Sequence, residues 1–167
     1  MQKIPVKSIV ITGTNGKSTT CKLIQHIFKT NGLDAKLGGN IGKPILDLKI
    51  SRKSVVIIEA SSFQLSYTKF IKPNIAAILN ITNDHLDWHN TTANYTESKL
   101  KIFSKQDSDD IALLNNKKLI KLFRKKNYLS KLKIVKRHTL NRTIAKKITN
   151  DYLISEPNLE NLEFVNR

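Results

Sequence analysis

The stretch I-T-G-T-N-G-K-S-T-T, residues Ile11–Thr20, links an apolar run to a segment with helical periodicity. It predicts a strand, a glycine loop and the N-terminus of a helix in immediate succession. Such a loop directs several backbone N–H groups and the positive end of a helix dipole at one point, which suits a phosphate group. Lys17 would then reach the outer phosphates, and the Ser18 hydroxyl would bind their Mg²⁺.

The match to the general phosphate-loop pattern is imperfect. That pattern has a glycine five positions before Gly16, where this chain has Ile11. A Gly-x-x-Gly-Lys-Ser string by itself could also be an ordinary turn followed by a helix cap. The strand before it and the amphipathic helix after it favour the phosphate loop.

The composition is that of one soluble globular domain. The chain has 167 residues, of which 40% are hydrophobic and 25% charged. We expect no membrane insertion, because no apolar run approaches the ~20 residues of a membrane span. The N-terminal residues contain no signal-peptide core, and the single cysteine, Cys21, excludes an internal disulfide. Both features predict a cytoplasmic protein, and Cys21 is expected to be a small buried side chain rather than a reactive thiol.

The net charge of +16 raises the possibility of a nucleic-acid-binding protein, and its distribution argues against it. The stretch from Lys117 to Asn150 holds 13 Lys and Arg and no acid, with apolar Leu119 and Phe123 at helical spacing. It has few aromatic residues for base stacking and no known nucleic-acid motif. We therefore interpret it as a solvated basic face and expect no nucleic-acid partner.

Strands and helices are predicted to alternate along the chain. This order is typical of an α/β fold, a three-layer, mostly parallel sheet with helices on both faces. We expect strands at Lys7–Ile11, Ala35–Leu37, Ser54–Glu59, Ile75–Asn80, Ile111–Asn115 and Lys133–Lys136, and helices at Ser18–Asn31, Thr92–Phe103 and Lys117–Lys126.

Polar residues follow successive predicted strands, at the end of the sheet where such folds bind ligands. Glu59 ends the Val-Val-Ile-Ile run and could hold Mg²⁺ directly or through water. Asn80 opens N-I-T-N-D-H-L-D-W-H, in which His85 beside Asp84 is the best candidate for function. His89 taken alone is more simply a solvated or structural imidazole. Asn40 lies in G-G-N-I-G, where glycines allow close approach of the backbone to a ligand.

Five motifs in this order resemble the ATP-binding central domain of the Mur ligases. They are G-T-N-G-K-S-T, G-G-N-I-G, E-A-S-S-F-Q-L, I-L-N-I-T-N-D-H-L-D-W-H and N-Y-T-E-S-K-L-K-I-F, and they span residues 11–103. The shortened phosphate loop is the form that this family uses. Within the family, S-S-F-Q-L and G-G-N-I-G are most similar to the branch that adds D-glutamate to UDP-N-acetylmuramoyl-L-alanine.

The resemblance implies roles for individual residues in binding ATP and Mg²⁺. Lys17 would bind the β- and γ-phosphates, and Ser18 with Glu59 would hold the Mg²⁺ shared with ATP. His85 would bind a second Mg²⁺. Lys99 matches a lysine that family members carbamylate, although the sequence alone would make it a solvated helix residue. The phosphate loop itself would comprise Gly13, Thr14, Asn15, Gly16, Lys17, Ser18 and Thr19.

Other residues would serve the second substrate. Asn40, Ser61 and Gln64 match positions near the muramoyl-alanine end of the substrate, and Asp84 would orient His85. Asp87 and His89 receive no role. Trp88 and Asn83 differ from the commonest residues of their motif, but neither is an expected ligand.

The implied reaction is ATP-driven amide formation in peptidoglycan precursor synthesis. The substrate carboxylate would attack the γ-phosphate to give an acyl phosphate, which the amine of D-glutamate would then attack. Lys17 and two Mg²⁺ ions would neutralise the charge that develops.

The resemblance covers only part of such a ligase. Family enzymes have an N-terminal UDP-sugar domain and a C-terminal amino-acid-binding domain, and this chain matches neither. It also carries no G-R-H-N-like motif, so adenine contacts are expected outside it. We therefore expect residues 1–167 to be a truncated central domain that does not complete ligation alone. Two alternatives are an ATP- and Mg²⁺-binding module without ligase activity and a basic nucleic-acid-binding protein.

Overall fold

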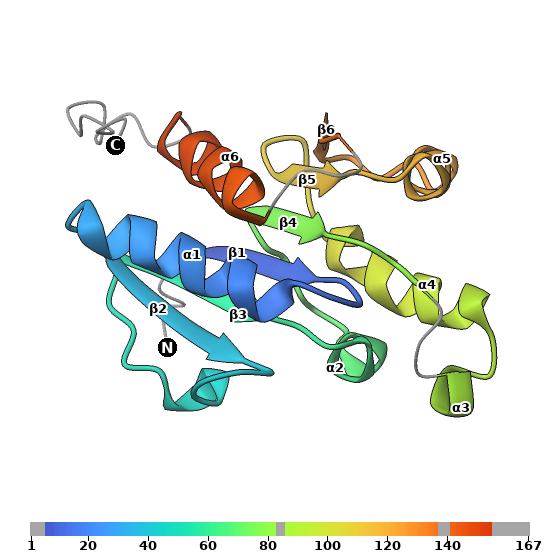
Figure 1. Cartoon of the computed structure of the whole chain (residues 1–167), viewed down its shortest axis with the longest axis horizontal. Helices are drawn as coiled ribbons and strands as arrows, with labels where there is room; N and C mark the ends of the chain where they lie inside the picture. The colour runs from blue at the N-terminus through green and yellow to red at the C-terminus, as the bar shows by residue number, and fades with distance from the viewer. Residues whose placement is uncertain (1–5, 83–85, 137–140, 155–167) are drawn as a thin grey trace.

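The computed structural model describes residues 6–82, 86–136 and 141–154. These residues form one six-stranded sheet in the order β2-β3-β1-β4-β5-β6, in which every neighbouring pair is parallel. Figure 1 shows the labelled strands crossing the middle of the molecule between the helices. The strands are β1 (Lys7–Thr12), β2 (Asp34–Gly39), β3 (Ser54–Glu59), β4 (Ile75–Ile78), β5 (Ile111–Leu114) and β6 (Lys131–Ile134).

Helices cover both faces of the sheet. α1 (Lys17–Thr30) and α6 (Asn141–Ile154) lie side by side on one face (Figure 1). The other face is covered by α2 (Ser62–Tyr67), α4 (Thr92–Leu100) and α5 (Lys117–Lys125). Three short helical segments complete the described part: α3 (Leu86–His89), η1 (Ile45–Asp47) and η2 (Lys101–Phe103).

Each face of the sheet has its own apolar core, because side chains alternate between faces along a strand. Ile9 and Ile11 of β1 pack with Ile24 and Phe28 of α1 on one side. Val10 faces the opposite core, which contains Leu100 and Phe103 among its buried residues. The central strands therefore consist almost wholly of apolar residues, as parallel strands covered on both faces require.

The predicted α/β fold is confirmed, and all nine expected elements are present with ends shifted by at most three residues. The last strand moves as a whole, from Lys133–Lys136 to Lys131–Ile134. The expected helix Thr92–Phe103 is an α-helix only to Leu100 and then tightens into η2.

Three helices were not predicted. α2 is only six residues long, and its sequence signal is the capping box formed by Ser61 and Gln64. α3 has only four residues and begins directly after residues 83–85, which lie outside the described part of the chain. α6 has an apolar residue on every fourth position, at Ile144, Ile148 and Tyr152, and all three are buried. That spacing is a sequence signal for a helix, and the helix begins within the basic stretch.

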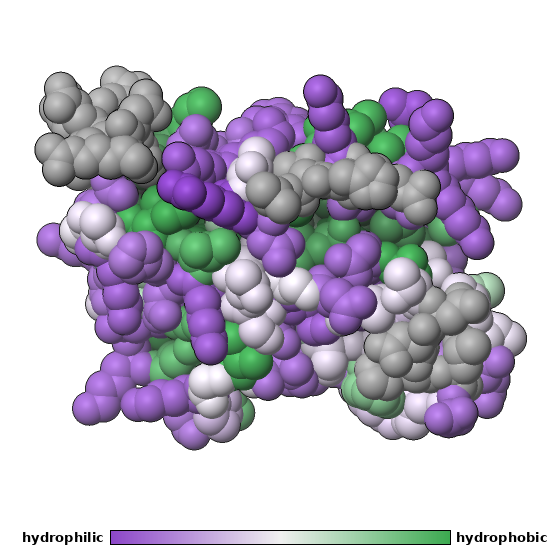
Figure 2. All heavy atoms as spheres, in the orientation of Figure 1, coloured by the Kyte–Doolittle hydropathy of each residue, from purple (hydrophilic) through white to green (hydrophobic). Residues whose placement is uncertain are grey.

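The basic stretch is a solvated face over α5, as expected. Leu119 and Phe123 are buried, and the basic side chains of α5 are exposed. Figure 2 shows hydrophilic side chains projecting over this part of the molecule. In β6, the Lys133 ammonium pairs at 2.5 Å with the buried carboxylate of Asp151, which ties β6 to α6. Among the described helices, none is both long and apolar enough to cross a membrane.

Candidate functional site

The phosphate loop lies where the order of the strands reverses. From β1 the chain runs to β2 and β3 on one side, and then crosses to β4, β5 and β6 on the other. In open parallel sheets, such a reversal leaves a crevice at the carboxyl ends of the strands, and ligands bind there. The loop after β1, Glu59 at the end of β3 and Asn80 after β4 all meet at this edge.

The side chain of Asn80 fixes the shape of the loop. Its Oδ1 accepts hydrogen bonds from the backbone N–H groups of Thr14 (3.1 Å) and Asn15 (2.8 Å). Its Nδ2 donates to the carbonyl of Asn15 at 2.9 Å. Ile11, at the position of the missing glycine, is fully buried in β1. The loop therefore begins at Gly13, and a glycine at position 11 would serve no turn.

Lys17 opens α1 and its side chain folds back over the loop. Its Nζ donates to the carbonyl oxygens of Gly13 (3.0 Å) and Thr14 (2.8 Å). The preceding Gly16 has a left-handed backbone (φ 82°), which turns the chain sharply into the helix. The ammonium group is thereby held over the loop at the positive end of a 14-residue helix, where anions bind.

Ser18, Glu59 and Asn40 form one hydrogen-bonded group beside the loop. The Ser18 hydroxyl donates to Oε2 of Glu59 at 2.8 Å, and Asn40 Nδ2 donates to Oε1 at 3.0 Å. Glu59 is 1% exposed, so its carboxylate is held in a fixed position by both neighbours. A hydroxyl and a carboxylate at this spacing fit a Mg²⁺ ion, which prefers oxygen ligands and keeps several waters.

Lys99 is buried, against the expectation from the sequence alone. It is 1% exposed, and its Nζ donates to Thr12 Oγ1 (3.3 Å) and to the Gly13 carbonyl (3.1 Å). The ammonium also lies 4.6 Å from the centre of the Tyr95 ring, a cation–π contact. A residue 82 positions after Lys17 in the chain thus contacts the same glycine carbonyl. Lys99 therefore lies beside the phosphate loop.

Asp84 and His85 lie outside the described residues, as does Asn83. His89, which received no role, is 4% exposed and stacks on the ring of Phe63, with centroids 5.7 Å apart. Trp88 and Tyr95 contact it edge-on, at 4.4 and 5.1 Å. His89 is thus a structural imidazole in an aromatic cluster, and not a solvated one. Asp87 is exposed.

Ser61 and Gln64 bond mainly to each other. The Ser61 hydroxyl accepts from the backbone N–H of Gln64 (3.2 Å), and Gln64 Oε1 accepts from the backbone N–H of Ser61 (2.9 Å). This reciprocal pair caps the N-terminus of α2 two residues after Glu59. Gln64 is also exposed. The pair therefore has a local structural role as the cap of α2.

Asn141 was missed by the sequence reasoning and lies against the phosphate loop. A Cβ atom placed on Gly16 would come within 2.8 Å of its Nδ2 and 3.0 Å of its Oδ1. Asn141 is the first residue of α6, so the N-terminal end of this helix reaches the site. Because α6 was not predicted, no reasoning from the sequence connected these two positions.

Cys21 is buried as predicted. Burial raises the pKa of its thiol above the ordinary value, and the negative charge of nearby Glu59 raises it further. A thiol in that environment stays protonated and inert at neutral pH.

Comparison with known proteins agrees with this geometry. Residues 11–163 match the model of the Mur ligase middle domain. The chain is 46% identical over 114 residues to a UDP-N-acetylmuramoylalanine–D-glutamate ligase from Citrifermentans bemidjiense, covering 67% of this chain and 25% of that protein. It is 51% identical over 107 residues to the ligase of the same name from Rickettsia felis, covering 64% and 24%. The chain thus spans about a quarter of the length of these curated relatives.

Solved structures show the same fold at lower identity. A UDP-N-acetylmuramoyl-L-alanyl-D-glutamate–2,6-diaminopimelate ligase superimposes with a TM-score of 0.62 at 22% identity, covering 81% of this chain and 33% of that chain. The MurF ligase of Thermotoga maritima, solved with ADP, gives a TM-score of 0.60 at 20% identity, covering 80% and 33%. The family model covers the chain from the end of β1 to beyond α6, and with it the strands β2 to β6, the loop and the Ser18–Glu59 pair. The chain therefore belongs to the Mur ligase family and carries its middle domain.

Proposed function

We propose that this chain is the ATP-binding part of a cytoplasmic ligase that adds D-glutamate to UDP-N-acetylmuramoyl-L-alanine in peptidoglycan precursor synthesis. The observation that carries the proposal is the hydrogen bond of 2.8 Å between Ser18 and Glu59, next to the ammonium of Lys17. Three groups that suit a triphosphate and its magnesium ion thus meet at the end of one sheet. The identity to D-glutamate ligases supports the choice of substrate.

The residues of the chain have distinct tasks in this proposal. Lys17 would leave the Gly13 and Thr14 carbonyls for the β- and γ-phosphates and offset charge on the phosphoryl group during its transfer. Ser18 and Glu59 would hold Mg²⁺, which offsets phosphate charge and aligns the phosphates. Asn40 would keep the Glu59 carboxylate in place. Little covalent work falls to the protein, because the acyl phosphate forms on the substrate.

Three further assignments belong to the same proposal. His85 would bind the second metal ion, with Asp84 to orient it. Asn40, Ser61 and Gln64 would meet the muramoyl-alanine end of the substrate. Since the chain spans about a quarter of its relatives' length, we further propose that ligation needs regions beyond residues 1–167.

Replacing Glu59 with glutamine tests the metal site. Glutamine keeps the shape and can still accept from Asn40, but it lacks the negative charge that holds Mg²⁺. We expect Mg²⁺ to increase the affinity of the wild-type protein for ATP. In E59Q, this increase in affinity should be smaller by roughly 10–100-fold. Calorimetric titration with and without Mg²⁺ measures both.

The matched control is E97Q, because Glu97 is half-exposed and pairs with Lys126 on the surface. It should bind ATP like the wild type. If Mg²⁺ increased the ATP affinity of E59Q as much as that of the wild type, Glu59 would be excluded from the metal site and the proposal would lose its basis.

We also propose that Lys99 is carbamylated. Its ammonium would first lose one proton. The neutral amine would then attack the carbon of CO₂ and release a second proton, which leaves an anionic carbamate. The buried position beside Gly13 would place that group near the metal ions and shield it from water. With isotopically labelled bicarbonate, the wild type should give a carbamate NMR signal that is absent in Lys99→Met. Identical spectra of the two proteins, recorded with ATP and Mg²⁺ present, would contradict carbamylation.

A further inference from the structure

Aromatic side chains gather at the surface where α2 and α3 approach each other. The Trp88 ring contacts the rings of Phe63 and Tyr67, with centroids 4.9 and 6.0 Å away. Trp88 is 42% exposed and Tyr67 is 77% exposed. Single exposed apolar side chains are common on proteins, whereas several that touch one another mark a binding surface. Figure 1 shows α2 and α3 at the end of the molecule to which the strands point.

These rings are continuous with the proposed catalytic site. The buried ring of His89 contacts both Trp88 and Tyr95, with centroids 4.4 and 5.1 Å away. The Tyr95 ring contacts the Lys99 ammonium at 4.6 Å, and its hydroxyl lies 3.2 Å from the Thr14 hydroxyl of the phosphate loop. A row of rings in contact thus leads from the phosphate loop to the surface at Trp88.

The same surface adjoins the residues proposed for the muramoyl-alanine end of the substrate. Phe63, whose ring contacts Trp88, lies in the chain between Ser61 and Gln64. Gln64 and Tyr67 are both exposed and lie three residues apart on α2, so they are neighbours on one side of this helix. A substrate that meets Gln64 with its muramoyl-alanine end would therefore bring its sugar ring to Trp88 and Tyr67.

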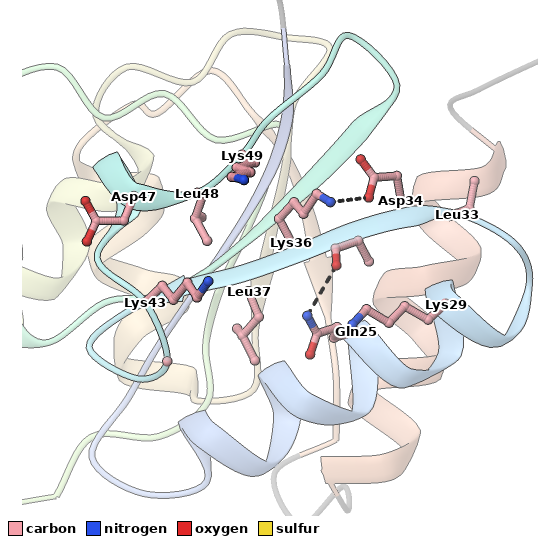
Figure 3. Close-up of a pocket in the computed structure, with 12 residues that line it drawn as sticks. Gln25, Lys29, Leu33, Asp34, Lys36, Leu37, Lys43, Asp47, Leu48 and Lys49 are labelled. Carbon is pink, nitrogen blue, oxygen red and sulfur yellow. Dashed lines mark hydrogen bonds and ion pairs between the residues drawn. The ribbon is translucent and has the colours of Figure 1, made fainter.

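The charge around the rings indicates an uncharged ligand. The chain has a net charge of +16, yet residues 54–68 and 73–98, which supply all these rings, contain no Lys or Arg. The cavity between α1, β2 and η1 differs in this respect. It has a volume of about 560 Å³, and four lysines line it (Figure 3): Lys29, Lys36, Lys43 and Lys49. Because phosphate-rich ligands bind where lysines gather, the aromatic surface suits a neutral ligand instead.

Polar side chains accompany the rings. Asp87 and Asn90 are exposed on either side of Trp88 in the chain, and Gln64 is exposed on α2. Carboxylate and amide groups form hydrogen bonds with sugar hydroxyls, which both donate and accept. The C–H groups on one side of a pyranose ring pack against an aromatic ring. The surface therefore offers both kinds of contact that a neutral sugar ring makes.

We propose that Trp88 and Tyr67 form a platform for the pyranose ring of the amino-sugar substrate. This inference rests on the proposed function, because it extends the same substrate site outward from Gln64. It assigns Trp88 a role in substrate affinity that its motif did not predict. The sugar ring, and not only the alanine end, should then contribute to binding by this chain.

The fluorescence of the chain offers a direct test. Trp88 is the single tryptophan, so tryptophan emission reports on this surface alone. The probe is N-acetylmuramoyl-L-alanine, added to the full chain with a non-hydrolysable ATP analogue and Mg²⁺ present. We expect a saturable change in emission. Lactoyl-L-alanine, which keeps the acid end but lacks the sugar, should bind at least about tenfold more weakly by calorimetry. Unchanged Trp88 emission, or equal affinity for the two probes, would overturn the proposal.

Two substitutions of Trp88 test the ring itself. Trp88→Leu stays apolar but has no flat ring, so it should bind N-acetylmuramoyl-L-alanine about tenfold more weakly. Trp88→Phe keeps a ring and should retain most of the affinity. The matched control is Phe70→Leu, because Phe70 is 86% exposed and belongs to none of the ring pairs described above. It should bind the sugar like the wild type. Wild-type affinity in Trp88→Leu, or equal losses in Trp88→Leu and Phe70→Leu, would refute the platform.

A separate titration with ATP and Mg²⁺ distinguishes this inference from the proposed function. The wild type and the three variants should bind the nucleotide equally, because all of them keep every residue of the phosphate loop. A wild-type chain that binds ATP with Mg²⁺ but not the sugar would overturn this inference alone. A wild-type chain that binds neither would remove the proposed function, and this inference with it.

Discussion

Replacing Lys17 with alanine is expected to weaken ATP binding by roughly 100-fold, or about 3 kcal/mol. The Lys17 ammonium already makes two hydrogen bonds to loop carbonyls, so it is held at the spot where phosphates would replace these acceptors. Charge-assisted bonds of this kind contribute about 1.5–3 kcal/mol each when both partners are well placed. Because Lys17 is only partly buried and contacts no core residue in these bonds, the fold should survive the change.

Titration calorimetry with ATP and Mg²⁺ measures the effect, and thermal unfolding monitors the fold. Lys22→Ala is the matched control, since Lys22 lies on the same helix and is exposed. Both proteins should unfold at the same temperature, and only Lys17→Ala should lose the nucleotide. A chain that binds no ATP in either form, yet binds DNA with a steep salt dependence that survives Lys17→Ala, would instead be a nucleic-acid-binding protein.

The parts of the fold that the sequence predicted well are those set by local pattern. The run of branched residues in Ser54–Glu59 can only be covered on both faces, and β3 has those bounds in the structure. The strand, loop and helix around Lys17 follow from apolar spacing and the glycines. The position of Glu59 at the end of a strand then places it at the ligand edge of the sheet, where Ser18 bonds to it.

What the sequence could not predict depends on contacts between distant segments. Lys99 looks like a solvated helix residue until the packing of α4 against the loop is known, and only the family motif placed it in the site. Asn141 comes to Gly16 because α6 packs beside α1, and no local signal specifies that neighbour. The place of β2 at the edge of the sheet likewise follows only from the pairing of strands that are distant in the sequence.

Gly39→Ala is expected to damage the fold and the site together. Gly39 ends β2 with φ 106°, a conformation that side chains rarely adopt. A Cβ atom there would overlap the carbonyl oxygen of Glu59 and come within 3.1 Å of Ile58 Cγ2. That carbonyl accepts the backbone N–H of Asn40 at 2.8 Å, and the Asn40 side chain holds the Glu59 carboxylate. The methyl group must therefore push apart the residues that position the proposed magnesium ligand.

Gly32→Ala separates this clash from backbone strain. Gly32 also has a positive φ, 76°, but a Cβ atom there would meet no atom within 4 Å. Strain alone should cost Gly32→Ala about 1 kcal/mol of unfolding free energy. Overpacking against β3 adds about 1–3 kcal/mol in Gly39→Ala. Urea unfolding of both proteins measures this difference in unfolding free energy. In titrations with ATP, Mg²⁺ should increase the affinity less than in the wild type only for Gly39→Ala. Equal destabilisation in the two variants would mean that β2 moves away from Glu59 freely, so that the close approach of these strands does not hold the carboxylate in place.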